Sequence, residues 1–335
     1  MKVVFILPYF GKLKSYFNLF LKTLSYNENV DLLLITDNKM ENNAMKNLKV
    51  INISFENFRK KIQDKFDFKI SLDTPYKLCD FKPAYGYICE EWISEYDYWG
   101  YCDCDVLFGD LSPIFSIMEK SYDRIFIAGH LSIYKNTKNN NRVFMCEHPS
   151  YGNLHKIVYS SERIFAFDEV YYKVSVNDLF VAKNAQIYED DLAYNVSTKR
   201  SLISRVTFNK STRKWEHEKS RNDQLYWENG HIYRLRYEQM KRKKDEFLYI
   251  HLQLRKMEYN AKLLDDSVIK IKYSGFYGMK HIPNNYIEYL FQKNFYINFN
   301  MIKSSIFSWL YRNDITHLRF QRPWEYNPYL SDEFN

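Results

Sequence analysis

Three short apolar runs, separated by amphipathic segments, constrain the fold of this chain most strongly. The runs KVVFIL at 2–7, VDLLLIT at 30–36 and LKVINI at 48–53 are nearly continuous in apolar residues. Such runs are typical of strands buried on both faces, as in parallel sheets. Segment 12–27 carries its apolar residues at helical spacing, and Ser54 suits the N-cap of a further helix. This alternation predicts an α/β fold with a mostly parallel sheet covered by helices on both faces.

The next apolar strand leads into two aspartates that lie one residue apart. The strand is DYWGYCD at 97–103, and the aspartates are Asp103 and Asp105. Carboxylates at this spacing turn toward one point where the chain kinks, and hard oxygen ligands suit Mg2+ or Mn2+, which in turn holds a diphosphate. Parallel sheets bind ligands at the carboxyl ends of their strands. The alternative is an acidic turn that caps a short helix at Ser112.

Other segments complete the expected elements. We expect Asp80 to cap a helix over 81–95. In the second half, Asn-Gly within LYWENGHIYRL at 225–235 predicts a β-hairpin, and EFLYIHL at 246–252 predicts a buried strand. From residue 284 onward the apolar spacing is helical.

Composition narrows the class of protein. The chain has 335 residues, of which 46% are hydrophobic, so it is long enough to bury a large core. A net charge of +7 suits an anionic ligand or an acidic membrane surface and falls short of a nucleic-acid signature. Five cysteines without a regular framework indicate reduced thiols. With no signal peptide or membrane span expected, the sequence predicts a cytoplasmic protein, soluble or peripheral on the inner membrane.

The acidic stretch resembles the Asp-x-Asp motif of GT-A glycosyltransferases. Further segments occur in the order found in an uncharacterised bacterial family of GT-A enzymes from capsule and lipopolysaccharide gene clusters: ILPYFG at 6–11, TD at 36–37, YKLCDFKPAYG at 76–86, FAFDE at 165–169 and IHLQLRKM at 250–257. The resemblance covers about residues 1–260. It implies a GT-A catalytic domain over 1–260, which a mainly helical extension over 261–335 would follow.

The resemblance also implies an activity. It is the metal-dependent transfer of a hexose or N-acetylhexosamine from a UDP-sugar to a capsule or lipopolysaccharide acceptor, either a glycan or a lipid-linked oligosaccharide. Asp103 and Asp105 would bind Mn2+ or Mg2+, with Cys104 between them beside the cofactor. Glycosyltransferase family 8 enzymes complete this site with a late histidine, which here is His251. The likeness to that family favours retention of anomeric configuration, and a satisfied core histidine is the alternative for His251.

Residues near the first two strands are candidates for the nucleotide base. By the same resemblance, Pro8, Tyr9 and Phe10 would form the base pocket, with Tyr9 stacking on the base. Asp37 would accept a hydrogen bond from a uracil. Core packing for Tyr9 and a turn for Asp37 are the alternatives.

Charged residues elsewhere are candidates for the phosphates and sugars. Lys82 would lie near the donor sugar and phosphates, unless it is a solvated lysine. Arg255 and Lys256 are alternatives for the diphosphate. Asp168 and Glu169 would face the donor sugar and the acceptor hydroxyl, and a helix N-terminus is the other interpretation of this acidic pair.

Two competing functions are open at this stage. DCDVL at 103–107 fits, in its aspartates, a haloacid-dehalogenase-like phosphatase with Asp103 as nucleophile, a second acidic pair within 188–195 and Lys183 as supporting cation. That motif normally ends the first strand of its domain, whereas three strand-like segments precede it here. A non-catalytic GT-A-like interaction module is the other alternative.

The C-terminal part raises the question of a membrane. Between residues 284 and 322, aromatic and apolar residues are interspersed with lysines and arginines. This pattern suits an interfacial helix on an anionic inner membrane, but it favours slightly more the alternative that these helices pack their apolar faces on the catalytic domain.

Overall fold

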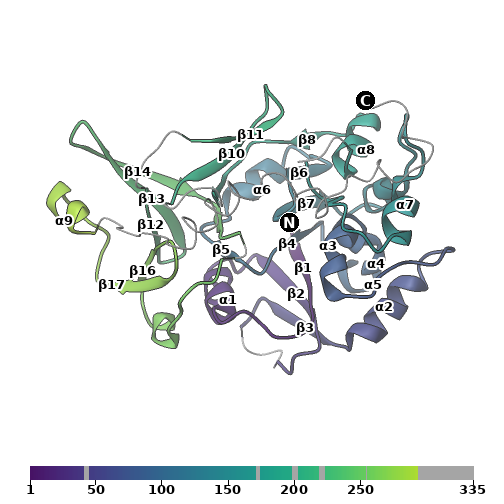
Figure 1. The fold of residues 1–335 in the computed structure, drawn as a ribbon, viewed down its shortest axis with the longest axis horizontal. Helices are drawn as coiled ribbons and strands as arrows, with labels where there is room; N and C mark the ends of the chain where they lie inside the picture. The colour runs from purple at the N-terminus through teal and green to yellow at the C-terminus, as the bar shows by residue number, and fades with distance from the viewer. Residues whose placement is uncertain (41–44, 171–173, 198–202, 219–222, 254, 293–335) are drawn as a thin grey trace, which may run out of the picture.

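A central sheet of seven strands organises the protein (Figure 1). The computed structural model describes residues 1–40, 45–170, 174–197, 203–218, 223–253 and 255–292. The strands of this sheet lie in the order β3-β2-β1-β4-β7-β6-β8. Their bounds are β1 Val3–Tyr9, β2 Val30–Thr36, β3 Leu48–Asn52, β4 Tyr98–Cys102, β6 Arg124–Ala128, β7 Leu131–Lys135 and β8 Ile187–Tyr188.

The central sheet is mostly parallel, as predicted. β1 pairs in parallel with both β2 and β4, and β2 pairs in parallel with β3. In this sheet only β7 runs against the others, because it pairs antiparallel with β4 and β6. The three apolar runs of the first 53 residues are therefore strands, as predicted, and the chain has a mixed α/β fold.

Alternate residues of the central strands feed two separate cores. In β1, Val4 and Ile6 join a cluster on one face, whereas Val3 and Phe5 join a cluster on the other. All four side chains are at most 1% exposed, so each contributes about 1.5–3 kcal/mol of burial free energy. The apolar run of β1 is nearly continuous because both faces of the central sheet are buried at this strand.

Helices cover both faces. One face carries α1 Phe17–Ser25 and α6 Pro113–Met118. The other carries α2 Phe55–Gln63, capped by the Ser54 side chain as predicted, with α7 Leu154–Ser160 and α8 Val176–Ala182.

The helix predicted over 81–95 is wrong in form. The segment folds as short consecutive turns: η1 Pro75–Lys77, α3 Leu78–Phe81, η2 Lys82–Ala84, α4 Tyr85–Ile88 and α5 Glu90–Ile93. Pro83 lacks the backbone N–H that a continuous helix needs. Asp80 is not a cap, because its fully buried carboxylate accepts the backbone N–H groups of Phe165 and Phe167.

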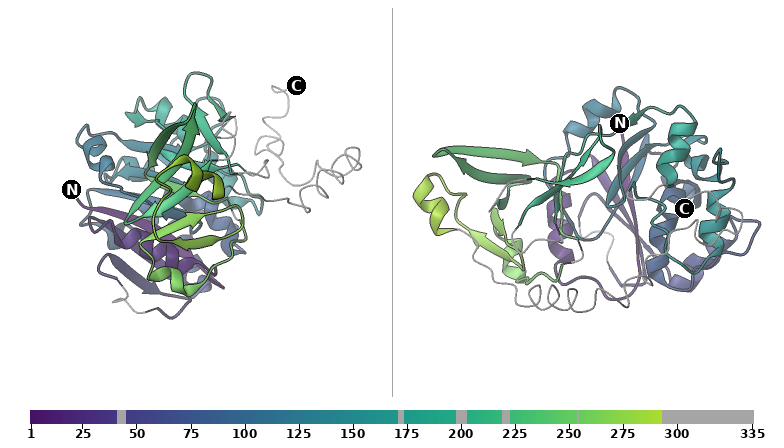
Figure 2. Two further views of the ribbon diagram at one scale, coloured as in Figure 1. Left: turned by 90° about the vertical axis from the view of Figure 1, so that its left-hand side faces the viewer. Right: turned by 45° about the horizontal axis from the view of Figure 1, so that its top comes forward.

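Two antiparallel-rich sheets continue from the central one. The second has the order β11-β10-β9-β15-β5, and the third has the order β14-β13-β12-β16-β17. Figures 1 and 2 show the third sheet and α9 projecting to one side of the central sheet. The remaining bounds are β5 Val106–Phe108, β9 Ala193–Val196, β10 Arg205–Asn209, β11 Lys214–His217, β12 Gln224–Glu228, β13 His231–Glu238, β14 Lys241–Phe247, β15 Tyr249–His251, β16 Val268–Ile271, β17 Phe276–Met279, α9 Tyr286–Phe291, η3 Asn140–Met145 and η4 Ala261–Leu264.

The predicted hairpin is confirmed, and the strand predicted over 246–252 is divided. β12 and β13 pair through a turn in which Asn229 and Gly230 both have positive φ, at 47° and 87°. Asn and Gly adopt this conformation readily, which explains the turn. The later strand is shared between the end of β14 and the short β15, which lie in different sheets.

The mainly helical extension predicted from residue 261 is wrong for the described part of that segment. β16 pairs with β12 and with β17, so residues 268–279 complete a sheet that begins before residue 260. Val268, Ile269 and Ile271 are buried there, and β-branched side chains pack well on a pleated surface.

α9 is a helix as predicted, while residues 293–335, with most of the proposed interfacial helix, lie outside the described residues. No helix in the described ranges is long and apolar enough to span a bilayer.

We expect Asp80→Ala to destabilise the fold by about 3–5 kcal/mol, because removing one partner of a buried ion pair leaves the other charge uncompensated. Lys77 Nζ lies 2.8 Å from Asp80 and also donates to the backbone oxygens of Val158 and Arg163. Urea unfolding followed by circular dichroism measures the change. The matched control is Asp73→Ala, whose exposed pair with Arg59 contributes at most about 1 kcal/mol. Equal losses in the two variants would contradict this role for Asp80.

Candidate metal site at the end of strand β4

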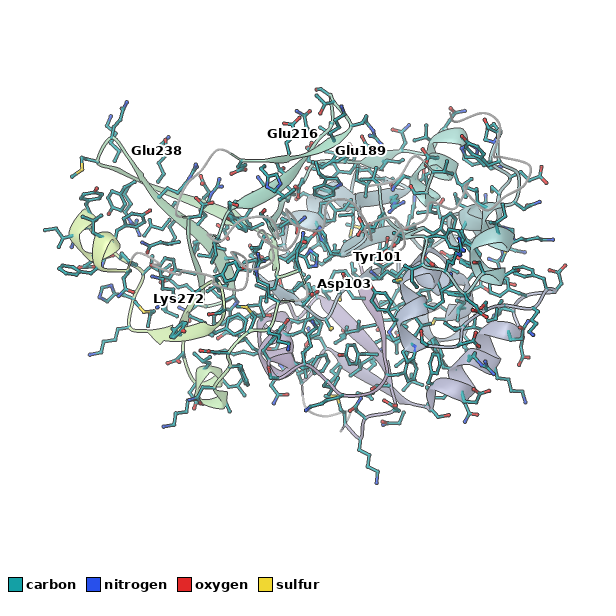
Figure 3. The ribbon with its side chains drawn as sticks, viewed as in Figure 1. Tyr101, Asp103, Glu189, Glu216, Glu238 and Lys272 are labelled. Carbon is teal, nitrogen blue, oxygen red and sulfur yellow. The ribbon has the colours of Figure 1, made fainter. Side chains whose placement is uncertain are left out.

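The acidic turn lies where the chain leaves the central sheet. β4 ends at Cys102, and after Asp103 and Asp105 the chain enters β5 of the second sheet. Figure 3 shows Asp103 near the middle of the molecule, beyond Tyr101 of β4. β5 pairs antiparallel with β15 so that Val106 lies opposite His251. This register brings a residue from late in the chain beside the two aspartates.

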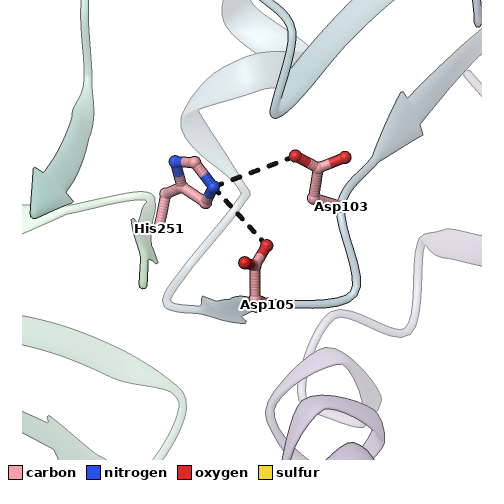
Figure 4. Close-up of side chains that lie close together, drawn as sticks. All are labelled: Asp103, Asp105 and His251. Carbon is pink, nitrogen blue, oxygen red and sulfur yellow. Dashed lines mark ion pairs between the residues drawn. The ribbon is translucent and has the colours of Figure 1, made fainter. Parts of the chain in front are cut away.

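The imidazole of His251 faces both carboxylates (Figure 4). Its Nε2 lies 3.8 Å from Asp103 Oδ2 and 3.5 Å from Asp105 Oδ1. One ligand atom from each residue lies within 4.8 Å of the others. Two carboxylates and an imidazole make a donor set that can hold a divalent cation, and the two carboxylates suit Mn2+ or Mg2+. The predicted ligands Asp103, Asp105 and His251 are thus brought together, and they fit a divalent cation.

A neighbouring amide sets the orientation of this histidine. His251 Nδ1 lies 3.0 Å from Asn195 Oδ1, which also accepts a hydrogen bond of 2.7 Å from Gln253 Nε2. Because an amide oxygen only accepts, Nδ1 carries the hydrogen, so in the neutral form of the ring Nε2 has the lone pair that a metal ion would take. Metal-binding histidines are usually oriented by such a hydrogen bond.

Lys82 links the acidic turn to a second pair of carboxylates. Its ammonium lies 2.7 Å from Asp103 Oδ1, 3.0 Å from Asp168 Oδ2 and 2.8 Å from the Gly129 carbonyl oxygen. Burial disfavours its charged form, but the carboxylates of Asp103 and Asp168 outweigh that effect and raise the pKa of Lys82 well above its usual value. The solvated-lysine alternative is therefore wrong.

Asp168 and Glu169 lie beside Lys82. Burial is the main cause that raises the pKa of both groups, to about 7 for Asp168. They are not at a helix N-terminus, because α8 begins at Val176 under a Ser175 cap. A side chain at Gly129 would meet their carboxylate oxygens at 2.5–2.6 Å, so only glycine fits there without a shift. Glu169 Oε2 is buried and has no hydrogen-bond partner among the described residues.

The end of β1 lies beside the acidic turn. The Tyr9 hydroxyl donates to the Lys12 carbonyl oxygen at 3.1 Å. Burial, followed by the neighbouring Cys104 thiol, raises the pKa of Tyr9 to about 12. Pro8 lies within the strand, opposite Ile35 of β2. Of the predicted base pocket, Tyr9 lies beside the acidic turn, next to Cys104 and Asp105.

Two residues predicted for the nucleotide have structural contacts. The Phe10 ring packs against Phe55 and Phe58 and is 9% exposed, so its side chain belongs to the core. Asp37 is exposed and accepts the backbone N–H of Gly11 at 2.9 Å. The turn expected as the alternative for Asp37 is therefore present, and its contact with a base stays a prediction.

Arg255 and Lys256 differ in their surroundings. Arg255 donates to the backbone oxygens of Ser197 and Leu252, and its guanidinium lies 4.9 Å from the Tyr273 ring centroid. Burial lowers the pKa of Arg255. Lys256 is exposed, so it is the more accessible of the two cations.

Several neighbours of the site were missed by sequence reasoning. Lys14 Nζ lies 3.7 Å from Asp105 Oδ2, and the ring of His130 lies 4.4 Å from that of His251. Asn195 is placed by β9, which pairs in parallel with β15. No motif marks these residues, because strand pairing and loop geometry bring them to the site.

Comparison with protein families assigns the chain to a group without a known activity. A family model described as a family of unknown function, DUF6625, matches residues 5–280. The chain belongs to this family. No curated protein is significantly similar to it. The matched range includes Asp103, Asp105 and His251, so the candidate metal site lies within the part of the chain that defines the family.

The residues proposed for a phosphatase have other partners in this DUF6625 chain. Glu189 pairs with Arg213, Asp190 with Lys210, and Asp191 with Arg205. The three arginine and lysine partners lie in β10 or in the turn between β10 and β11. Figure 3 shows Glu189 near the edge of the molecule, away from Asp103. The cation beside Asp103 is Lys82, in place of the expected Lys183. This arrangement disfavours the phosphatase hypothesis.

We expect the stability of the wild-type protein to fall, relative to Asp168→Asn, as pH rises from about 4 to about 7. The folded pKa of Asp168 is raised to about 7, against about 3.9 when unfolded, so the folded state binds more protons in this window. Stability from such a group is present at low pH and is lost as pH rises. Urea unfolding at several pH values measures the difference. Asp73→Asn, an exposed control, should show no such trend, and a pH-independent difference for Asp168→Asn would contradict the assignment.

Proposed function

We propose that the chain is a metal-dependent glycosyltransferase of the GT-A type. It would move a hexose or N-acetylhexosamine from a UDP-sugar to a cell-surface glycan of the capsule or lipopolysaccharide class. One observation carries the proposal: His251 Nε2 faces Asp103 and Asp105 at 3.8 and 3.5 Å, while Asn195 holds its other ring nitrogen. An acidic turn that served only as a helix cap would not need an oriented imidazole.

The sheet order supports this proposal. β2 and β3 follow β1 toward one edge of the central sheet, whereas β4 pairs on the other side of β1. Open α/β sheets bind ligands at the point where the strand order reverses, outside the carboxyl ends of the strands. Tyr9 ends β1, and Asp103 and Asp105 follow β4 at that point. A mostly parallel sheet with helices on both faces also suits the GT-A fold that the sequence resemblance implied.

Each residue then has a distinct task. Asp103, Asp105 and His251 would hold Mn2+ or Mg2+, which when bound offsets the negative charge that develops on the diphosphate as the glycosidic bond breaks. Asn195 keeps the His251 lone pair directed at the site. Lys82 holds Asp103 and Asp168 in place through a buried ion network. Tyr9 and Asp37 are the candidates for the uracil base.

Retention of configuration is part of the proposal. An inverting enzyme needs a carboxylate free to deprotonate the acceptor hydroxyl. Asp168 is engaged by Lys82 and is 2% exposed, so it is poorly placed for that task. Glu169 Oε2 is likewise buried in this structure, so it too is poorly placed to deprotonate an acceptor.

We expect His251→Ala and Asp105→Ala to lower Mn2+-dependent turnover of a UDP-sugar by more than about 100-fold. Mutation of a residue that orients a metal ligand typically lowers activity about 10–100-fold, so turnover of Asn195→Ala should fall by that factor. Loss of a ligand itself should lower turnover further. A panel of nucleotide sugars with and without Mn2+ finds the donor, and calorimetry follows Mn2+-dependent binding of UDP.

The matched control for this experiment is His231→Ala. His231 also pairs with a carboxylate, Glu246 at 2.7 Å, but it lies in the third sheet. It should keep turnover within about twofold, as expected of a surface substitution that costs at most about 0.5 kcal/mol. UDP binding that does not depend on Mn2+, or equal turnover in His231→Ala and His251→Ala, would remove the metal-site assignment.

The product should keep the anomeric configuration of the donor. Anomeric coupling constants measured by NMR on the product distinguish the two outcomes. A β-linked product from an α-linked donor would show inversion, and Glu169 would then become the candidate base.

A further inference from the structure

Lys14 is a cation beside the acidic turn that has no assigned task. It lies in the loop between β1 and α1, and its side chain is 19% exposed. Its ammonium is 3.7 Å from Asp105 Oδ2, which is beyond hydrogen-bond distance. Among the described residues it has no hydrogen-bond acceptor, although an ammonium carries three donors. This cation therefore has donors to offer to a ligand.

Lys82 does not have this capacity. Its three hydrogens are matched by three oxygen atoms at 2.7–3.0 Å, from Asp103, Asp168 and Gly129. Its side chain is 11% exposed. Lys82 thus maintains the acidic cluster, whereas the more exposed Lys14 has N–H groups available beside it.

The backbone around Lys14 is anchored. The Tyr9 hydroxyl donates to the Lys12 carbonyl oxygen, and the Gly11 N–H donates to Asp37. The Lys14 carbonyl oxygen accepts the Phe17 N–H at 3.0 Å, at the start of α1. A fixed backbone places the ammonium near Asp105 and leaves only the side chain to move.

The two oxygen atoms of Asp105 face different partners. Oδ1 faces His251 at 3.5 Å, and Oδ2 faces Lys14 at 3.7 Å. An anion that approaches a divalent cation held by Asp105 and His251 therefore comes within reach of Lys14. β1 and β4 are neighbours at the reversal of strand order, so the loop that carries Lys14 and the turn that carries the aspartates both follow strands that end at the expected ligand position.

We infer that Lys14 binds the diphosphate of the nucleotide donor. The inference rests on the proposed function and adds a phosphate-binding residue that neither the sequence motifs nor Arg255 and Lys256 supply. On binding, the ammonium moves from Asp105 to a phosphate oxygen, so it opposes the metal alone and favours the metal together with a diphosphate. Lys14 is a specificity residue, because it separates nucleoside diphosphates from nucleosides.

Calorimetry on the full chain tests this inference with Lys14→Met and the matched control Lys12→Met. Lys12 is an exposed lysine of the same loop, and only its backbone oxygen has a described contact. Lys14→Met should bind UDP and inorganic pyrophosphate, each with Mn2+, at least about tenfold more weakly than the wild type, because a hydrogen bond between two charged groups is lost. Lys12→Met should match the wild type, and Lys14→Arg should restore most of the affinity.

Two further ligands separate phosphate binding from a structural role. Uridine affinity should be unchanged in Lys14→Met, and the affinity for Mn2+ alone should be unchanged or higher, because a competing positive charge is removed. Weaker binding of all these ligands would indicate a structural role and overturn the inference. So would equal UDP affinity in Lys14→Met and Lys12→Met, with the proposed function intact. A wild-type protein that binds neither UDP nor pyrophosphate with Mn2+ would overturn the proposed function as well.

Discussion

The pairing of β15 with β5 and β9 is the constraint on which the candidate site depends. In this register His251 lies opposite Val106 on one side and Asn195 on the other. The imidazole thus meets the acidic turn and its orienting amide at once. Tyr249 and Ile250 are buried beside Leu107 and Phe108, and a slip of one residue would turn all of them to the opposite face. Burial of these apolar side chains therefore fixes the geometry of the polar site.

Two buried lysines, Lys77 and Lys82, link the short helical turns of residues 75–84 to the candidate site. Lys77 pairs with Asp80, whose carboxylate binds the backbone just before Asp168. Lys82 then joins Asp168 to Asp103. Buried charges are costly unless each is paired and hydrogen-bonded, and these are. The network ties the turns of residues 75–84 to the segment around Asp168, and so holds five charged side chains in a defined arrangement.

Local sequence predicted those elements whose signals are themselves local. Continuous apolar runs indicated β1 to β3, Ser54 indicated the start of α2, and Asn229-Gly230 indicated the hairpin. The errors arose where tertiary contacts override local preference. The expected helix is divided because Pro83 lacks a backbone N–H and because Asp80 accepts hydrogen bonds from the distant backbone of Phe165 and Phe167. Residues 268–279 form strands because β16 pairs with β12.

The candidate site shows the same division. The sequence alone determined that two carboxylates follow a buried strand and that a histidine ends a later one, because residue type and strand pattern are written locally. Only the tertiary structure decided that these groups meet within 4.8 Å and that Asn195 orients the ring. It also decided that the ammonium of Lys82 has three oxygen partners, whereas that of Lys14 lies 3.7 Å from Asp105 and can still donate to a ligand. Distances between residues far apart in the chain depend on strand register and packing, which no single segment specifies.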